Sequence, residues 1–248
     1  FTLGRGFQLN DRRVLGLVAA GAAGGVAATF NAPLAGILFA LEVILSEFGL
    51  RTFGALVIAV VAASGVSRSF LGPAPAFPVA GFTEVSAWEL GLYIGLGLSA
   101  SIVAVAFSRL LSYAEGVFSG LSVPRFLKPA LGGLGVGVVG LMAPQVFGMG
   151  FQTIEDALRG NLGLGLLLAL LAAKMLATAL TLGSGSAGGI IAPALFLGAM
   201  LGGASGHIVH TVLPGVTAES GSYAIVGMAA VFAGAVRAPV TAVLLLFE

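Results

Sequence analysis

The sequence of 248 residues has no cysteine, only two histidines and few charges of either sign. Without cysteine the chain can form neither disulfides nor thiolate metal sites. His207 and His210 have no acid near them in the sequence, so we expect no metal site there either. The net charge of +1 gives no strongly basic surface, and we therefore expect no nucleic-acid partner.

Charged residues make up 8% of the chain, whereas about a quarter is usual in a soluble protein. Hydrophobic residues make up 58%, and the apolar runs lack the roughly ten-residue alternation of a membrane β-barrel. We therefore predict an all-α integral membrane protein that crosses the lipid bilayer several times and has no soluble domain. The apolar blocks cover residues 14–46, 52–67, 90–108, 129–147, 161–182, 187–213 and 222–248.

Glycine is abundant, with 39 residues, and many glycines lie four positions apart. In lipid, this spacing lets the backbones of two helices approach closely. We expect most of these glycines to serve helix packing. The pairs are Gly21/Gly25, Gly91/Gly95, Gly133/Gly137 and Gly198/Gly202.

The first apolar block is too long for a single membrane crossing. Residues 14–41 carry no charge, and as one helix they would measure about 42 Å against a hydrocarbon core of about 30 Å. The segment Asn31-Ala-Pro33 predicts a break, because Asn31 can cap the second helix and proline is tolerated in a first turn. We expect two short helices that meet inside the membrane, where protein or a watery cavity must surround the interrupted backbone.

The same pattern recurs at the end of the sequence. Residues 21–42 and 227–248 align at an offset of 206 residues, as from Pro33 to Pro239. An internal repeat with matched broken segments is typical of transporters whose site lies where the repeats meet. We count about five crossings between the copies, and an odd number predicts that they are inverted. The identical pairs are Gly21/Gly227, Ala23/Ala229, Ala27/Ala233, Ala32/Ala238, Pro33/Pro239, Leu38/Leu244 and Glu42/Glu248.

A glycine-rich stretch, residues 181–193, is the strongest candidate for a binding site. Its sequence, TLGSGSAGGIIAP, follows one apolar block and opens the next, so it should leave unpaired backbone N–H groups at a helix start. Free donors and the positive end of the helix dipole both favour an anion. Interrupted membrane helices use the same arrangement for anionic substrates.

Two other classes of function fit the sequence poorly. Residues 183–188 match the dinucleotide pattern GxGxxG, but that motif requires a preceding strand and an acid about 20 residues later. Here an apolar block precedes it, and no acid occurs between Asp156 and Glu219. The apolar blocks contain no paired acids, Ser/Lys dyad or histidine ligands for an intramembrane enzyme. We therefore expect neither enzymatic activity nor a cofactor.

Four stretches resemble the CLC family of chloride channels and chloride/proton exchangers. Residues 183–193, GSGSAGGIIAP, are similar to the family signature GSGxPGGIFAP. Residues 21–42 and 227–248 resemble corresponding stretches of the family's two halves, and KMLATALTLGSG at 174–185 fits as well. The four stretches follow the family order, and the resemblance covers essentially residues 1–248.

This resemblance implies a partial transmembrane domain of tilted and broken helices in two inverted halves. Residues from about 1 to 70 would form the end of the first half, and residues from about 87 to 248 would form most of the second half. The chain would be incomplete at both ends, because the family's gating glutamate and two further anion contacts, a serine and a tyrosine, would lie outside it. A homodimer is also implied, joined through helices within about 32–69, with a chloride pathway in each subunit, in the cell (plasma) membrane.

The resemblance assigns anion binding to the backbone amides around Gly188, Gly189, Ile190 and Ile191, with chloride as the transported substrate. Ala187 replaces the family's proline, and Ile191 replaces its phenylalanine. The second change removes a ring that could shape the pathway, but it leaves the amide donors in place.

Glu42 and Val43 are the candidates for a proton path or for gating. In exchangers of this family the internal proton-transfer acid would match Val43, which cannot titrate. Glu42 matches the preceding position, and an intramembrane acid is a functional candidate by default. For Glu42 we expect a structural role, as a helix-end acid held by hydrogen bonds, with a proton relay as the alternative. We therefore predict passive, channel-type chloride conduction, with chloride/proton antiport as the alternative.

Two basic residues lie near these motifs. Lys174 interrupts an apolar block, and we expect it to snorkel or to pair at a helix end; raising the local anion concentration is the alternative. Arg237 could bias the electrostatic field near the second break.

Overall fold

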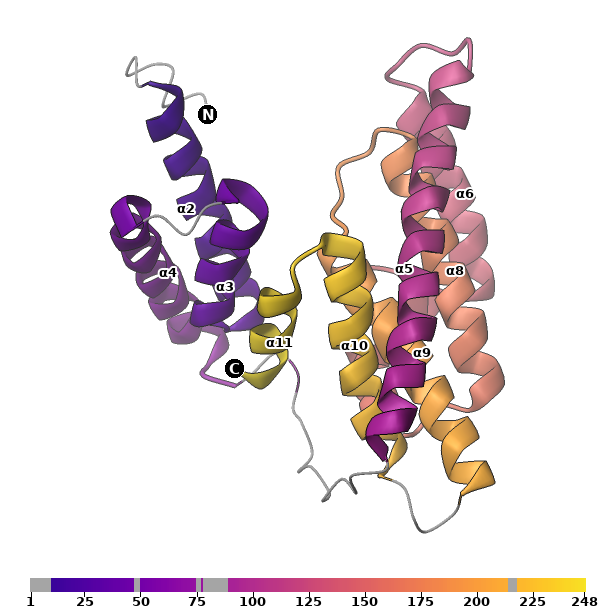
Figure 1. Ribbon diagram of the computed structural model, residues 1–248. Helices are drawn as coiled ribbons and strands as arrows, with labels where there is room; N and C mark the ends of the chain where they lie inside the picture. Colours follow the sequence, from indigo (N-terminus) through magenta and orange to yellow (C-terminus); the bar gives the residue numbers. More distant parts are fainter. Residues whose placement is uncertain (1–9, 47–49, 75–76, 78–88, 214–217) are drawn as a thin grey trace. The chain divides into compact units, whose positions relative to one another are not determined.

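The computed structural model describes residues 10–46, 50–74, 77, 89–213 and 218–248. These residues form helices and connecting segments and contain no strand, which confirms the all-α prediction. The chain divides into two compact units (Figure 1). Unit 1 combines Phe1–Pro78 with Arg237–Glu248, and unit 2 covers Val79–Val236.

Unit 1 contains the first copy of the broken pattern and the part of the second copy from Arg237 onward. Its helices pack mainly through alanines and aliphatic side chains, including Ala19, Ala23, Ile37 and Leu56. Helix α3 lies beside α11, although they are about 200 residues apart in sequence, and α2 packs against α3 and α4 (Figure 1). The elements of unit 1 are α2 (Asp11–Phe30), α3 (Pro33–Phe39), the π-helix η1 (Ala40–Leu45), α4 (Leu50–Leu71) and α11 (Pro239–Phe247).

The predicted break after α2 is confirmed, but Asn31 has a different role from the one expected. Asn31 adopts a left-handed conformation with φ of 54° and ends α2, so Ala32, which has no side-chain capping bond, precedes α3. The Asn31 amide donates to the carbonyls of Pro73 and Ala74 at 2.8 and 2.9 Å, and its oxygen accepts from Arg68 Nε at 2.6 Å. A left-handed residue suits a helix end, because it reverses the chain so that a following N–H can bond a last carbonyl of the helix, as the Ala32 N–H does with the Ala27 carbonyl at 3.2 Å.

Unit 2 is a helical bundle around α9, which has buried side chains along most of its length. Helix α9 packs against α10 and α8, and α5 packs against α8 and α10. The elements of unit 2 are α5 (Glu89–Gly120), α6 (Lys128–Met142), the 3₁₀ turn η2 (Pro144–Val146), α7 (Phe151–Leu158), α8 (Leu164–Gly183), α9 (Ile191–Val212) and α10 (Ser220–Val236).

Only one of the predicted glycine pairs forms a close helix contact among the described residues. A Cβ added at Gly198 or Gly202 would come within 3.0 Å of the α10 backbone around Met228 or Ala224. The other three predicted pairs lie at positions where an added Cβ would meet nothing within 4 Å. Glycine spacing identifies a narrow helix face, but close packing also needs a second helix opposite that face.

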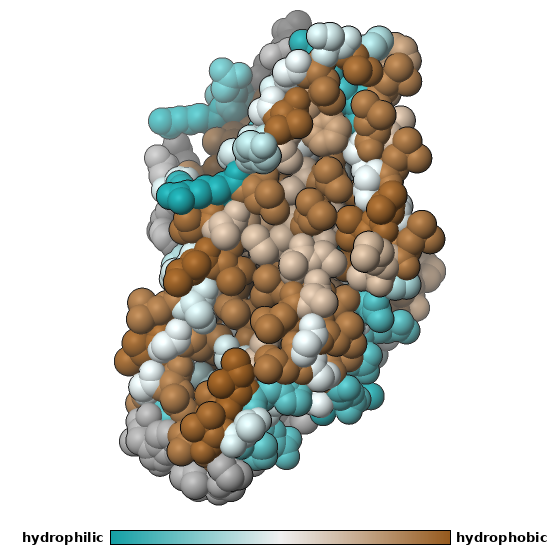
Figure 2. Space-filling view, turned by 90° about the vertical axis from the view of Figure 1, so that its right-hand side faces the viewer, coloured by the Kyte–Doolittle hydropathy of each residue, from teal (hydrophilic) through white to brown (hydrophobic). Residues whose placement is uncertain are grey.

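Several helices are long and apolar enough to cross a membrane. Within the described residues they are Asp11–Phe30, Thr52–Leu71, Glu89–Gly120, Leu164–Gly183 and Ile191–Val212. The 32 residues of α5 span about 48 Å, more than the hydrocarbon core of about 30 Å. Figure 2 shows a broad apolar surface on the side where α6 and α8 lie, consistent with exposed Leu134, Leu141 and Leu168. These features make the chain an integral, multi-pass membrane protein.

The contact between α9 and α10 predicts the effect of one added methyl group. Gly202→Ala would force the two backbones apart, and we expect it to lower the thermal unfolding midpoint by roughly 3–10 °C. Gly95→Ala adds the same atom in open space on α5 and should leave the midpoint unchanged or slightly raised. Thermal unfolding of the two purified variants in detergent measures this difference, and equal midpoints would contradict the close contact.

Candidate anion site at the start of helix α9

The glycine-rich stretch forms a tight turn between α8 and α9. Helix α8 ends at Gly183, and Gly185 adopts a left-handed conformation with φ of 83° that favours glycine. The Gly185 N–H donates to the Leu182 carbonyl at 3.0 Å, and the Ser186 N–H donates to the Thr181 carbonyl at 3.2 Å. This pair of bonds is a Schellman motif, which satisfies the end of α8 with its own backbone.

Directly after this motif, a run of backbone donors is unpaired within the described part of the chain. Among the residues that the structure describes, the N–H groups of residues 187–192 have no acceptor, and the next bond is from Ala194 N–H to the Ile190 carbonyl at 3.0 Å. The first N–H groups of any helix lack partners within that helix. Here the non-helical residues before α9 extend the set of free donors. The structure therefore confirms the unpaired amides that the sequence predicted.

The residues that carry the free amides are exposed or half-buried. Ala187, Gly188 and Gly189 are exposed, and Ile190 and Ile191 are half-buried. Gly189 has neither a positive φ nor a neighbour within 4 Å of an added Cβ, so neither strain nor packing within the chain requires glycine there. The lack of a side chain leaves the backbone open to a ligand.

The electrostatics of this helix start favour a negative charge. Helix α9 has 22 residues, and the aligned peptide dipoles place a partial positive charge of about half a unit at its N-terminus. The site has amide donors, so it can bind an anion without a cationic side chain. Such a site can hold an anion weakly enough for the anion to leave again.

Lys174 does not snorkel to the surface, and it pairs with no acid among the described residues. Its side chain is 3% exposed, and its Nζ donates to the carbonyls of Val146 and Gly148 at 2.8 and 2.7 Å. The ammonium also lies 5.0 Å from the centre of the Phe196 ring, within cation–π range. Lys174 therefore joins α8 to the end of η2 and to the second turn of α9. Snorkelling was predicted because an ammonium group is usually solvated by water. Here two carbonyl oxygens accept its hydrogen bonds in place of water.

The other predicted site residues belong to unit 1. Glu42 lies in the π-helix η1, and its carboxylate accepts from the backbone N–H groups of Val240 and Thr241 at 3.2 and 3.0 Å. The Thr241 hydroxyl donates a third bond at 2.7 Å. Glu42 is therefore fully engaged at the start of α11. Val43 is 37% exposed and has no polar side-chain atom.

A buried acid, Glu89, lies at the start of α5. Glu89 is 1% exposed, and one carboxylate oxygen accepts from the Ala218 N–H at 2.6 Å, while the other has no partner in the described chain. The spacing of Ser86 and Glu89 is typical of a local capping box, but Ser86 lies outside the described residues. Nothing in the sequence indicated the contact with Ala218, because 129 residues separate the two.

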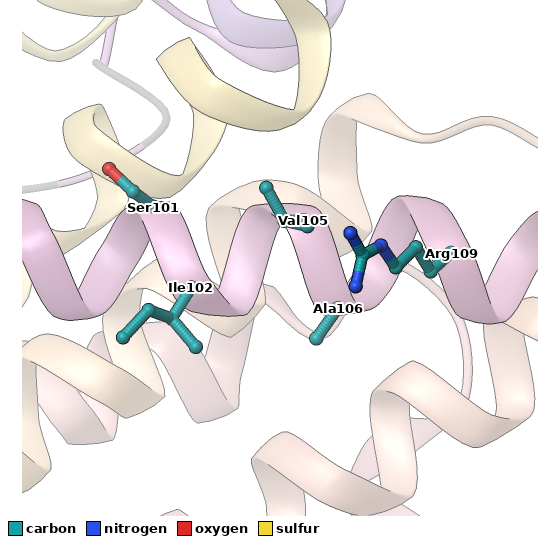
Figure 3. A pocket seen from close by; sticks show the side chains of 5 residues that line it. All are labelled: Ser101, Ile102, Val105, Ala106 and Arg109. Carbon is teal, nitrogen blue, oxygen red and sulfur yellow. The ribbon is translucent and has the colours of Figure 1, made fainter.

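A surface hollow of about 350 Å³ lies along α5 (Figure 3). Its described lining comes from α5 alone, and the Arg109 guanidinium reaches back along the helix toward Val105 and Ala106. None of the predicted site residues lines it. We therefore assign the candidate anion site to the start of α9 and not to this hollow.

The fold and the site define a class of protein: a multi-pass membrane protein with interrupted helices and unpaired amides at a helix start. Residues 2–248 match the protein family described as voltage gated chloride channel. The chain belongs to this family, and the resemblance found in the sequence is confirmed.

Relatives with different names match the chain. It is 40% identical to chloride channel protein CLC-f of Arabidopsis thaliana over 259 residues, covering 96% of this chain and 33% of the relative. It is 38% identical to the H(+)/Cl(-) exchange transporter ClcA of Salmonella agona, covering 94% of this chain and 50% of the relative. The chain thus spans half or less of the length of these two curated relatives.

A solved structure supports the fold. The crystal structure of a slow cyanobacterial Cl-/H+ antiporter matches with a TM-score of 0.86 at 27% identity, covering 98% of this chain and 58% of the other. The similarity therefore extends along nearly the entire sequence and is not limited to the glycine-rich stretch.

Proposed function

We propose that the protein transports chloride across a membrane and holds the anion at the start of α9. The observation that carries this proposal is the run of amides at residues 187–192, which belong to exposed or half-buried residues and have no acceptor among the described residues. Gly188, Gly189, Ile190 and Ile191 are the residues we assign to the anion. The names of the relatives support chloride as the substrate.

Passive conduction is the mode that the residues of unit 1 favour. Val43 has no group that can carry a proton, and the Glu42 carboxylate is occupied by three donors from α11. Chloride/proton antiport is the second candidate. It is favoured by the similarity to proteins named as exchange transporters and to an antiporter of known structure.

A flux experiment separates these two modes. The purified protein is placed in liposomes with a chloride gradient, and chloride and proton movements are recorded together. We expect chloride efflux without proton movement in a fixed ratio to it. Proton movement in a constant ratio would establish antiport instead, and the absence of chloride efflux would contradict transport by this protein.

The contribution of a single amide can be tested by replacing it with an ester. An ester at position 190 keeps the shape of the chain but removes the N–H donor, so chloride affinity measured by calorimetry should fall about tenfold or more. An ester at Ala194 is the matched control, since that N–H is already bonded to the Ile190 carbonyl. Equal affinities for the two ester variants and the parent protein would contradict the assigned site.

We also propose a homodimer in the cell (plasma) membrane, where a chloride gradient is available. The described part of α4 exposes large apolar side chains that include Phe53, Ile58 and Val61. These three residues lie within the region of about 32–69 that the family resemblance assigns to the dimer interface. Exposed apolar side chains in a membrane protein contact either lipid or a second protein.

A cysteine placed on α4 tests the dimer, because the chain has no cysteine of its own. Ile58→Cys should give a cross-linked dimer in membranes treated with a short thiol-reactive linker. Leu134→Cys is the control on α6, since the two native side chains are 72% and 69% exposed. Cross-linking that is absent in both variants, or equal in both, would contradict an interface through α4.

A further inference from the structure

The last residue of the sequence makes a contact that corresponds to the contact of Glu42. The Glu248 carboxylate accepts from the backbone N–H groups of Leu34 and Ala35, each at 3.0 Å. These two donors form the first turn of α3, directly after Pro33. Both partners belong to unit 1, where α3 and α11 lie side by side (Figure 1).

The two contacts are reciprocal. Glu42 ends the first broken segment and binds the start of α11, whereas Glu248 ends the second segment and binds the start of α3. The offset of 206 residues relates the acceptors Glu42 and Glu248. It also relates the donors, which pair as Leu34 with Val240 and Ala35 with Thr241. Because the end of each segment binds the start of the other, the two segments must run antiparallel, as in a two-fold symmetric interface. This arrangement agrees with the inverted repeat that the sequence predicted.

The backbone of the breaks follows the same symmetry. Asn31 and Arg237, at equivalent positions, are both left-handed, with φ of 54° and 61°. The next residues, Ala32 and Ala238, have φ and ψ of −121° and 82°, and −131° and 73°. Neither alanine supplies a side-chain cap. Both breaks therefore leave the first amides of the following helix without a local acceptor.

Physical chemistry explains why a distant carboxylate takes this place. An unpaired amide in the hydrocarbon region costs several kcal/mol, and the first turn of a helix has several amides without partners. A carboxylate offers two oxygens that only accept, and its charge is favoured by the positive end of the helix dipole. Hydrogen bonds to a charged group are also shorter and stronger than those between neutral groups.

We infer that Glu42 and Glu248 are a matched pair of positioning residues that hold the two interrupted helices together. The pair, here called the glutamate clasp, consists of these two carboxylates and the first turns of α3 and α11. Each carboxylate supplies the cap that the break itself lacks. The role of Glu42 is therefore the same as that of Glu248, and neither carboxylate acts as a proton carrier.

The test compares Glu42→Gln, Glu248→Gln and the double variant. Glutamine keeps the size of the side chain but replaces one accepting oxygen with an NH₂ group that faces N–H donors. We expect each single variant to lower the thermal unfolding midpoint by roughly 5 °C or more, and by similar amounts. The double variant should lose less than the sum of the two, because both changes open the same contact.

Two controls make the result specific. Glu219→Gln removes an exposed carboxylate in unit 2 that makes no side-chain hydrogen bond among the described residues; because Glu219 directly precedes α10, we expect only a small loss, well below that of either clasp variant. Thr241→Val removes one of the three donors to Glu42 and should cause a smaller loss than Glu42→Gln. It also provides a milder variant if the glutamine variants fail to fold.

The pH dependence of chloride flux provides a further measurement, because a purely capping role of the two carboxylates would leave it unchanged. In liposomes, the clasp predicts that Glu42→Gln and Glu248→Gln alter flux alike and leave its pH profile unchanged. A changed pH profile in Glu42→Gln alone would overturn the inference in favour of a proton relay. Midpoints no lower than that of Glu219→Gln would overturn it as well. The unfolding measurements do not depend on transport, so a failure of the proposed function can be distinguished from a failure of this inference.

Discussion

A helix that begins inside a membrane needs hydrogen-bond acceptors for its first backbone N–H groups, because the hydrocarbon core contains no water that could accept from them. Helices α3, α11 and α9 all begin directly after an interruption in an apolar segment. The starts of α3 and α11 are capped by carboxylates of the chain itself. The start of α9 has no such acceptor among the described residues, although it has the same kind of donors.

This difference connects the architecture to the proposed function. Carboxylates already occupy the positive ends of α3 and α11, so a mobile anion would have to compete with a tethered one there. At α9, the Schellman motif at Gly185 completes the end of α8 without using the following amides, and Lys174 bonds elsewhere, to the carbonyls of Val146 and Gly148. The donors of residues 187–192 are therefore left for a ligand. Anion selectivity at such a site depends on backbone geometry more than on charged side chains.

The sequence predicts the features of this fold that arise from local chemistry. Asn-Ala-Pro and Arg-Ala-Pro place the two breaks, since proline removes a donor and favours a first turn. Four glycines within residues 183–189 predict free amides before α9, and the structure has them. The repeat also predicts inversion, which agrees with the antiparallel contacts of α3 and α11.

Long-range contacts are what the sequence leaves open. Glu42 and Glu248 stand in register in the repeat, but their donors lie about 200 residues away, and no pattern near either acid identifies them. Glycine spacing likewise predicts a packing face at Gly95 as readily as at Gly202, because spacing does not specify which helix lies opposite. We expected Lys174 to reach water or an acid. The sequence could not indicate the carbonyls that bind it, because they belong to a turn 26 to 28 residues earlier.

The central claim is that an anion binds to the amides at the start of α9. Crystals of the protein grown with bromide in place of chloride test it most directly, because bromide scatters anomalously and can be located without assumption. The account predicts an anomalous peak within hydrogen-bond distance of the Ile190 and Ile191 N–H groups. Bromide found at other positions in the protein, with this helix start consistently empty, would contradict it.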